Sequence, residues 1–264
     1  MVARLAEISR VDFDDPIDSL YLYGQRVIVL LQKSPYSTYY AEGDVRMPMG
    51  VAMIWPPYYE KSATVVVAVD ITDPNSPAVT ARNELDGSLV SSRLTNDRLI
   101  LVLAYAPTLP YTVDLLSLSA LSVQDVLPMM RTADGDSLAV APENCYYPES
   151  PAGFAITTVV TLDAGNIALQ LGSVGVMANA ETIYASTDAV YFTATDYDPN
   201  DNYRARTNIH KFALGDQGVA SYVASGTVPG TLLNQFSLGE HQGYLRVATH
   251  TDATFANVTL IWPV

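Results

Sequence analysis

The sequence predicts an all-β protein, a β-propeller of about four blades with four antiparallel strands in each. Short runs rich in β-branched and aromatic residues recur along the 264 residues and are separated by polar turns. Units that open with a continuously apolar strand and go on with alternating strands occur at 63–105, 154–197 and 205–250. Without two longer insertions, each unit approaches the roughly 40 to 50 residues of a propeller blade. The repetition favours a propeller over a β-sandwich, which also joins short strands by polar turns.

The first blade is expected to combine the two ends of the chain. Residues 1–33 supply two clear β runs, SLYLY and RVIVLLQK, joined by a Gly24-Gln25 turn. They lack the apolar strand with which the other units begin, whereas 257–262 is an apolar strand without a unit of its own. Pairing 257–262 with 1–33 would close a four-bladed ring and remove two exposed sheet edges. We therefore predict a single domain over residues 1–264.

Two insertions interrupt the repeats. Residues 34–62 are rich in Tyr and Pro, and residues 106–153 contain the best helix candidate, over 114–130. In this candidate Leu115, Leu118 and Val126 recur at helical spacing. Insertions in repeat proteins lie on one face and commonly carry function, so both segments are candidate binding elements.

The charge of the chain limits its partners. Asp and Glu number 28 against 14 Lys and Arg, which gives a formal net charge of -14. Such a surface repels phosphate backbones and anionic lipid, so nucleic acid is not an expected partner. No apolar run approaches the ~18 residues of a membrane helix, so membrane insertion is not expected. Cys145 is the single cysteine, which rules out an internal disulfide, and we interpret it as a buried structural thiol.

The tyrosines of the two insertions are the first candidate site. Five come from 34–62 and two from 106–153, namely Tyr36, Tyr39, Tyr40, Tyr58, Tyr59, Tyr146 and Tyr147. Exposed together, they would form a face suited to recognition of a protein or a polysaccharide. The alternative is that they cover the ends of the ring and pack against blade edges.

An acidic loop is the second candidate site. Asp196, Asp198 and Asn200 place oxygen side chains at positions one, three and five, and Asp201 follows. This spacing can surround a Ca²⁺ ion, which prefers hard oxygen ligands, so calcium is a possible cofactor and none is required. The pattern lacks the glycine of the sharp turn, and Thr207 stands where a bidentate Glu is expected. The alternative is an ordinary inter-strand loop with Asx turns.

The evidence for catalysis is weak. Glu240 and His241 are adjacent, and a carboxylate with an imidazole can do general acid/base work when both face a cleft. Adjacent residues in a turn usually do not converge, so we assign no catalytic residue. There is also no Gly-x-Ser-x-Gly elbow, no glycine-rich phosphate loop and no Cys-x-x-Cys pair.

Several segments resemble one family. VDITDPNSP, LVSSRL, LILVLAY, CYYPES, VYFTATDY and above all SGTVPGTLLNQFSLGEHQGYLRVAT resemble the secreted bacterial and archaeal β-propeller domain family, which is distantly related to WD-repeat propellers and has no assigned function. The resemblance covers nearly the whole chain, which corresponds to about the first half of that family's domain. It implies a secreted or cell-surface protein and brings no catalytic residues.

Together these observations predict a binding scaffold that recognises a protein or polysaccharide through its loops. A hydrolase or lyase with a site in the central channel is the alternative activity. A structural domain of a longer surface protein is the third possibility. A closed ring would be a monomer, and a half ring would associate, because its blade faces would be exposed.

Overall fold

The computed structural model describes residues 6–33, 62–107, 121–148, 153–198, 204–215 and 219–251, and the backbone of 256–263. The described residues are almost entirely β-structure, as predicted. Four sheets account for them, and we number these sheets along the chain. Helical structure among the described residues is limited to α2 (Val123–Val126) and the 3₁₀ turns η2 (Pro142–Asn144) and η3 (Gln235–Ser237).

Each sheet is a meander, and sheets 1 and 2 carry added strands at one edge. Sheet 1 contains β1 (Ile17–Tyr23), β2 (Arg26–Lys33), β3 (Ala63–Asp70), β4 (Ala78–Asp86), β7 (Met129–Thr132) and β8 (Gly135–Leu138). Sheet 2 contains β5 (Ser88–Thr95), β6 (Arg98–Tyr105), β10 (Ile156–Asp163), β11 (Gln170–Met177) and β9 (Cys145–Tyr146). Sheet 3 contains β12 (Thr182–Ala185), β13 (Ala189–Asp198), β14 (Arg204–Leu214) and β15 (Ala220–Pro229). Sheet 4 contains β16 (Leu238–His241), β17 (Tyr244–His250) and β18 (Ala256–Pro263).

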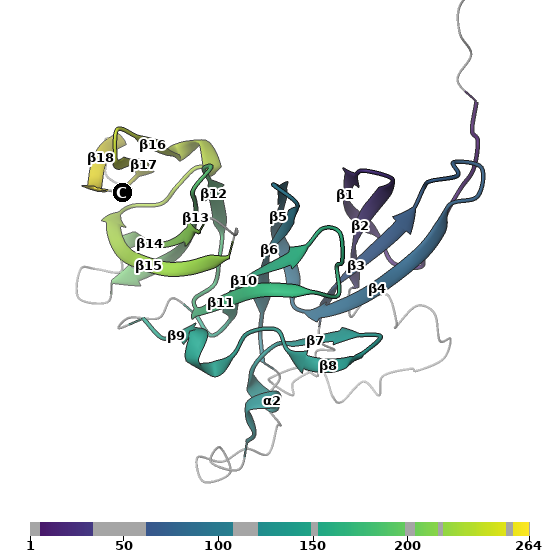
Figure 1. Ribbon diagram of the computed structural model, residues 1–264. Coiled ribbons are helices and arrows are strands. Elements are labelled where there is room, and N and C mark those ends of the chain that lie inside the picture. The colour runs from purple at the N-terminus through teal and green to yellow at the C-terminus, as the bar shows by residue number, and fades with distance from the viewer. Residues whose placement is uncertain are drawn as a thin grey trace, which may run out of the picture.

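The sheets follow one another along an arc. In Figure 1 the first strands β1, β5 and β12 lie toward the concave side, and β4, β11 and β15 lie toward the convex side. Sheets 1 and 4 occupy the two ends of the arc. This arrangement places consecutive sheets face to face, as in the blades of a propeller.

Apolar side chains fill the spaces between consecutive sheets. Leu30, Leu101 and Val160 belong to a buried cluster between sheets 1 and 2, and similar clusters lie between sheets 2 and 3 and between sheets 3 and 4. A strand in the middle of an inner sheet is therefore buried on both faces. This explains the continuous β-branched runs, which are typical of strands without a solvated face.

The predicted blade boundaries are wrong by two strands. The meander over 63–105 is divided after Asp86, because β3 and β4 pair with β1 and β2 while β5 and β6 pair with β10. The units 154–197 and 205–250 are divided in the same way. Gly87 alone forms the corner between β4 and β5, with φ +113°. A Cβ atom at this position would lie 2.9 Å from the carbonyl oxygen of Ala104, so the corner requires glycine. Because the corner is a single residue, it is as short as a hairpin turn and resembles one in the sequence.

The predicted closure of the ring is also wrong. β18 pairs antiparallel with β17, from His250 opposite Ala256 to Tyr244 opposite Pro263, and the described strands of the first blade do not include it. The outer face of sheet 1 is covered instead by the segment 6–16. Val11 and Phe13 of this segment pack against the buried side chains of β2 and β3 on that face.

The predicted helix ends earlier than expected. Residues 108–120 lie outside the described residues, and α2 ends at Val126. Leu127 precedes Pro128 and has an extended backbone with ψ 150°, because the proline ring disfavours the helical conformation in the residue before it. Met130 then pairs with Leu85, so the end of the predicted helix is a strand of sheet 1.

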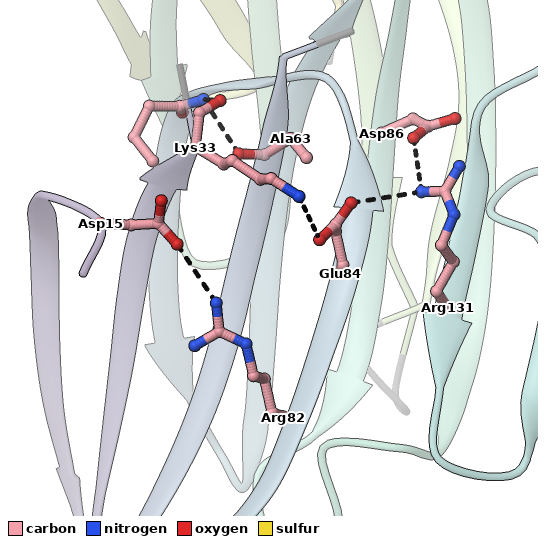
Figure 2. A network of polar contacts seen from close by, with 8 residues as sticks. Asp15, Lys33, Ala63, Arg82, Glu84, Asp86 and Arg131 are labelled. Atoms are coloured by element: carbon pink, nitrogen blue, oxygen red, sulfur yellow. Dashed lines mark hydrogen bonds and ion pairs between the residues drawn. The ribbon is translucent and has the colours of Figure 1, made fainter. Parts of the chain in front are cut away.

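A polar network fastens β7 to the edge of sheet 1 (Figure 2). The carboxylate of Asp86 is 2% exposed and accepts hydrogen bonds from the Arg131 guanidinium at 2.7 Å and the Met129 N–H at 3.1 Å. Glu84 lies 3.6 Å from Arg131 and 3.2 Å from Lys33. The network therefore joins three strands on the outer face of sheet 1.

Candidate functional site

Strand direction places the long connections at one end of the sheets. Successive strands of each meander run in opposite directions, so the connection from second to third strand and the corner to the next sheet share an end. We call this the insertion end. The connections that follow Lys33, Tyr105, Asp198 and Pro229 begin at this end. The short turns lie at the opposite end, which we call the turn end, where Arg26 of sheet 1 donates to the carbonyl oxygen of Ala164 in sheet 2 at 3.3 Å.

A repeated threonine contact fixes the insertion end of three sheets. The hydroxyl of Thr64 donates to the carbonyl oxygen of Gly87 at 3.0 Å, 23 residues later. Thr157 and Thr207 make the corresponding contacts to Ala178 and Gly230, at 2.7 Å each and 21 and 23 residues later. All three hydroxyls are buried. Each contact joins the start of a third strand to the corner that leads to the next sheet. The loops at this end therefore begin at backbone positions that these hydrogen bonds fix.

The corner between sheets 3 and 4 presents two apolar side chains to solvent. Leu233 and Phe236 are each 86% exposed. The side chain of Asn234 accepts a hydrogen bond from the Phe236 N–H at 2.9 Å, which caps η3. Thr231 exchanges two backbone hydrogen bonds with His250, at 2.8 and 2.9 Å. The two side chains are therefore exposed on an ordered turn.

Other exposed aromatic side chains gather at the same end. Among the described residues, the exposed large aromatics at the insertion end are Tyr146, Tyr147, Phe154, Tyr197 and Phe236, and Tyr244 is at the turn end. They come from sheets 2 and 3 and from the corner before sheet 4. The insertion end thus concentrates amphipathic and apolar side chains in a chain of net charge -14.

The predicted tyrosine site is only partly within the described residues. Tyr36, Tyr39, Tyr40, Tyr58 and Tyr59 lie outside them. Tyr146 belongs to β9, and its ring lies 4.7 Å from that of Tyr222 on sheet 3. Tyr147 follows and is exposed. Tyr146 therefore packs on a neighbouring blade edge and is 42% exposed, and recognition through the tyrosines stays a prediction.

The predicted calcium site stays a prediction. The Asp196 carboxylate is bound by the Arg206 guanidinium, with the shorter contact at 2.6 Å. For Asp198 only the backbone is described, and Asn200 and Asp201 lie outside the described residues. Thr207 is the buried hydroxyl that contacts Gly230. The part of the chain that the structure describes holds no group of three or more His, Cys, Asp or Glu placed to bind a metal ion.

Glu240 and His241 lie on opposite faces of β16. Glu240 points toward sheet 3, where its carboxylate accepts from the Tyr191 hydroxyl and its N–H donates to the Tyr184 hydroxyl at 3.1 Å. Burial and the carboxylate raise the pKa of Tyr191. His241 is exposed on the other face. Glu240 therefore joins sheets 3 and 4, and its side chain does not meet that of His241 in an acid/base site.

A buried imidazole lies between sheets 2 and 3. Nδ1 of His210 is 3.0 Å from the hydroxyl of Tyr222, and its ring stacks on Phe192 at 4.7 Å. Burial lowers the pKa of His210 to about 4. Cys145 is half-buried nearby on β9, and burial followed by the charge of Glu143 raises the pKa of its thiol. A neutral imidazole and a protonated thiol are structural groups here, since no charged partner that would activate either of them is among the described residues.

The arrangement of face-to-face meanders matches one known domain. The family model described as Beta propeller domain matches residues 2–261. The chain belongs to the β-propeller domain family. No curated protein and no solved structure matches it. No helix among the described residues of the propeller is long and apolar enough to cross a membrane.

Sequence reasoning missed two of the most exposed apolar side chains among the described residues. Leu233 and Phe236 lie in a stretch with strand-like residues on both sides, so they read as core positions. The available signal was composition, because 227–239 contains no charged residue and has glycines at 230 and 239. A turn with large apolar residues between two glycines indicates an exposed contact, since a turn cannot bury both its side chains and its backbone.

Proposed function

We propose that this propeller is an extracytoplasmic recognition scaffold that binds a protein partner through its insertion end. The observation that carries the proposal is the exposure of Leu233 and Phe236 on an ordered turn. Exposed apolar side chains of this size in one place mark interaction sites in soluble proteins. An ordered turn also reduces the conformational entropy that is lost on binding.

The two side chains can contribute a substantial part of a binding free energy. Burying one Leu or Phe side chain fully contributes about 1.5–3 kcal/mol. The pair would contribute about 3–6 kcal/mol, which corresponds to roughly a hundredfold to ten-thousandfold in affinity. Phe154, Tyr147 and Tyr197 lie at the same end of the sheets and would extend the contact.

Polysaccharide is the second candidate ligand. Tyr146, Tyr147 and Tyr197 favour it, because a tyrosine ring can stack on a sugar face while its hydroxyl forms hydrogen bonds. Leu233 offers neither, so the corner before sheet 4 favours a protein. The location outside the cytoplasm is part of the proposal and follows from the resemblance to secreted propellers.

Site-specific photo-crosslinking tests the proposal. A benzoylphenylalanine replaces Phe236 in one variant and Leu169, which is exposed at the turn end, in a control. Both are expressed in the source organism and irradiated. We expect a discrete protein adduct at position 236 that is absent at position 169. Adducts of equal yield at both positions, or at neither, would contradict recognition of a protein by the insertion end. Binding of purified cell-surface polysaccharide that is lost on Tyr147→Ala would support the second candidate instead.

A further inference from the structure

The outer edge of sheet 3 differs from those of the two preceding sheets. In sheet 1, β7 pairs with β4, the fourth strand of the meander. In sheet 2, β9 pairs with β11, which is also the fourth strand. In sheet 3 the fourth strand is β15, and no described strand lies beyond it (Figure 1). The chain between β6 and β10 thus adds strands to the outer edges of sheets 1 and 2, and no described strand is added to the equivalent edge of sheet 3.

β15 is a long strand without charge. It spans Ala220–Pro229, ten residues with the sequence ASYVASGTVP. Natural edge strands are usually short, or carry Lys, inward charges, internal Pro or β-bulges, which hinder pairing with another chain. Here Pro229 is the last residue, and a bulge at Val223 is the single irregularity in the pairing with β14. Val223 is an exposed apolar side chain, 54% accessible.

The strand is held in a conformation that can pair. β14 pairs with β15 along the whole length of β15, from Leu214 opposite Ala220 to Arg206 opposite Pro229. Tyr222 fixes one face through its contacts with His210 and Tyr146. In an antiparallel sheet every second residue of an edge strand directs its N–H and C=O away from its neighbour. β15 therefore presents backbone donors and acceptors outside the sheet on both sides of the bulge at Val223.

We propose that β15 is the site at which a second copy of this chain binds, β15 against β15, in an antiparallel pairing about a twofold axis. Four strands from each copy would then form one continuous sheet. A twofold contact is self-complementary, because the same strand serves both copies. The absence of charge on β15 matters for this partner in particular, since two chains of net charge -14 repel each other and like charges on paired strands destabilise a sheet.

Charge exchange at Val223 tests the pairing. Sedimentation velocity of the full chain is expected to show a monomer–dimer equilibrium. Val223→Lys and Val223→Glu each place like charges on the two paired strands, and each alone is expected to be monomeric. A mixture of the two variants is expected to recover the dimer, because Lys in one copy faces Glu in the other. Leu169→Lys adds the same charge at the turn end and is expected to leave the equilibrium unchanged. Circular dichroism checks that each variant is folded.

Hydrogen exchange identifies the strand. Amides of 220–229 are expected to become more protected as the concentration of the wild-type chain rises. A wild-type monomer at every concentration overturns the proposal, and so does a dimer that persists in both charged variants. A monomer whose β15 amides are already protected also overturns it, since another part of the same chain then covers this edge.

Discussion

Acidification is expected to destabilise the propeller through His210. This side chain is 2% exposed, and its contacts with described residues include the Tyr222 hydroxyl and the Phe192 ring and no acidic side chain. Its pKa is about 4 in the folded protein, against 6.5 for an unperturbed imidazole. The unfolded chain therefore takes up a proton at a higher pH than the folded chain does. The stabilisation is fully present above about pH 6.5 and is lost as the pH falls toward about 4.

The pKa values determine the size of the effect. The pKa values of the folded and unfolded states differ by about 2.5, and a difference of one in pKa corresponds to about 1.36 kcal/mol. The loss of folding free energy therefore cannot exceed about 3 kcal/mol. At about pH 4.5 the loss should be close to about 2.5 kcal/mol, because the folded imidazole has begun to titrate there. This is a large fraction of the ~5–15 kcal/mol by which domains are stable.

Urea unfolding at about pH 7 and about pH 4.5 measures this loss, with three proteins compared. His210→Gln keeps a polar partner for Tyr222 and removes the titration. Between the two pH values, its free energy of unfolding should therefore decrease by about 2.5 kcal/mol less than that of the wild type. His241→Gln removes an exposed imidazole and should behave as the wild type. Equal pH dependence in the wild type and His210→Gln would refute the assignment.

Three further substitutions test individual contacts by their effect on the free energy of unfolding. Thr207→Val removes the hydrogen bond to Gly230 and should destabilise by about 1–2 kcal/mol, whereas Thr187→Val at an exposed turn should change little. Asp86→Asn weakens the buried contact with Arg131 and should destabilise by about 2 kcal/mol. Its control, Asp15→Asn, weakens an ion pair with Arg82, whose side chain is half exposed, and should change stability by less than about 1 kcal/mol. Gly230→Ala places a Cβ atom 2.4 Å from the His250 carbonyl oxygen at φ +86°, so it should destabilise by more than about 1 kcal/mol, and a neutral result would mean that the corner relaxes freely.

The fold class could be predicted from sequence because it depends on local patterns. Alternation, turn residues and repetition all act over a few residues, and they correctly indicated β-meanders in propeller-like sheets. The boundaries between sheets could not be predicted in the same way. Gly87 leads to a new sheet and Asn96-Asp97 continues one, yet both are short polar turns between strands. The distinguishing signal is non-local, a buried Thr about one hairpin before each corner, as at Thr64 and Thr157.

The pairing of the last strand was not accessible to local reasoning either. The apolar run 257–262 fits any buried strand, so its sequence does not specify its neighbour. In the structure β17 lies next to it in the chain and pairs with it after a short connection. Such local pairing has a lower entropic cost than joining the two ends of the chain, which closes a much longer loop.

The candidate site was predicted in part. The expectation that insertions gather on one face led to Tyr146 and Tyr147, which the structure places at the insertion end. Leu233 and Phe236 were missed, because the predicted unit 205–250 places them in a strand rather than in an exposed turn. Whether a side chain is buried depends on the corner between two sheets, and that corner is a property of the assembled propeller.

The affinity of the crosslinked partner measures the central claim most directly. The partner captured at position 236 would be purified and titrated by calorimetry with the wild type and with a Leu233→Ser/Phe236→Ser variant. Both side chains are exposed in the free propeller, so the variant should fold normally. Recognition through the insertion end predicts that the affinity falls by roughly a hundredfold or more. An unchanged affinity in a folded variant would contradict it.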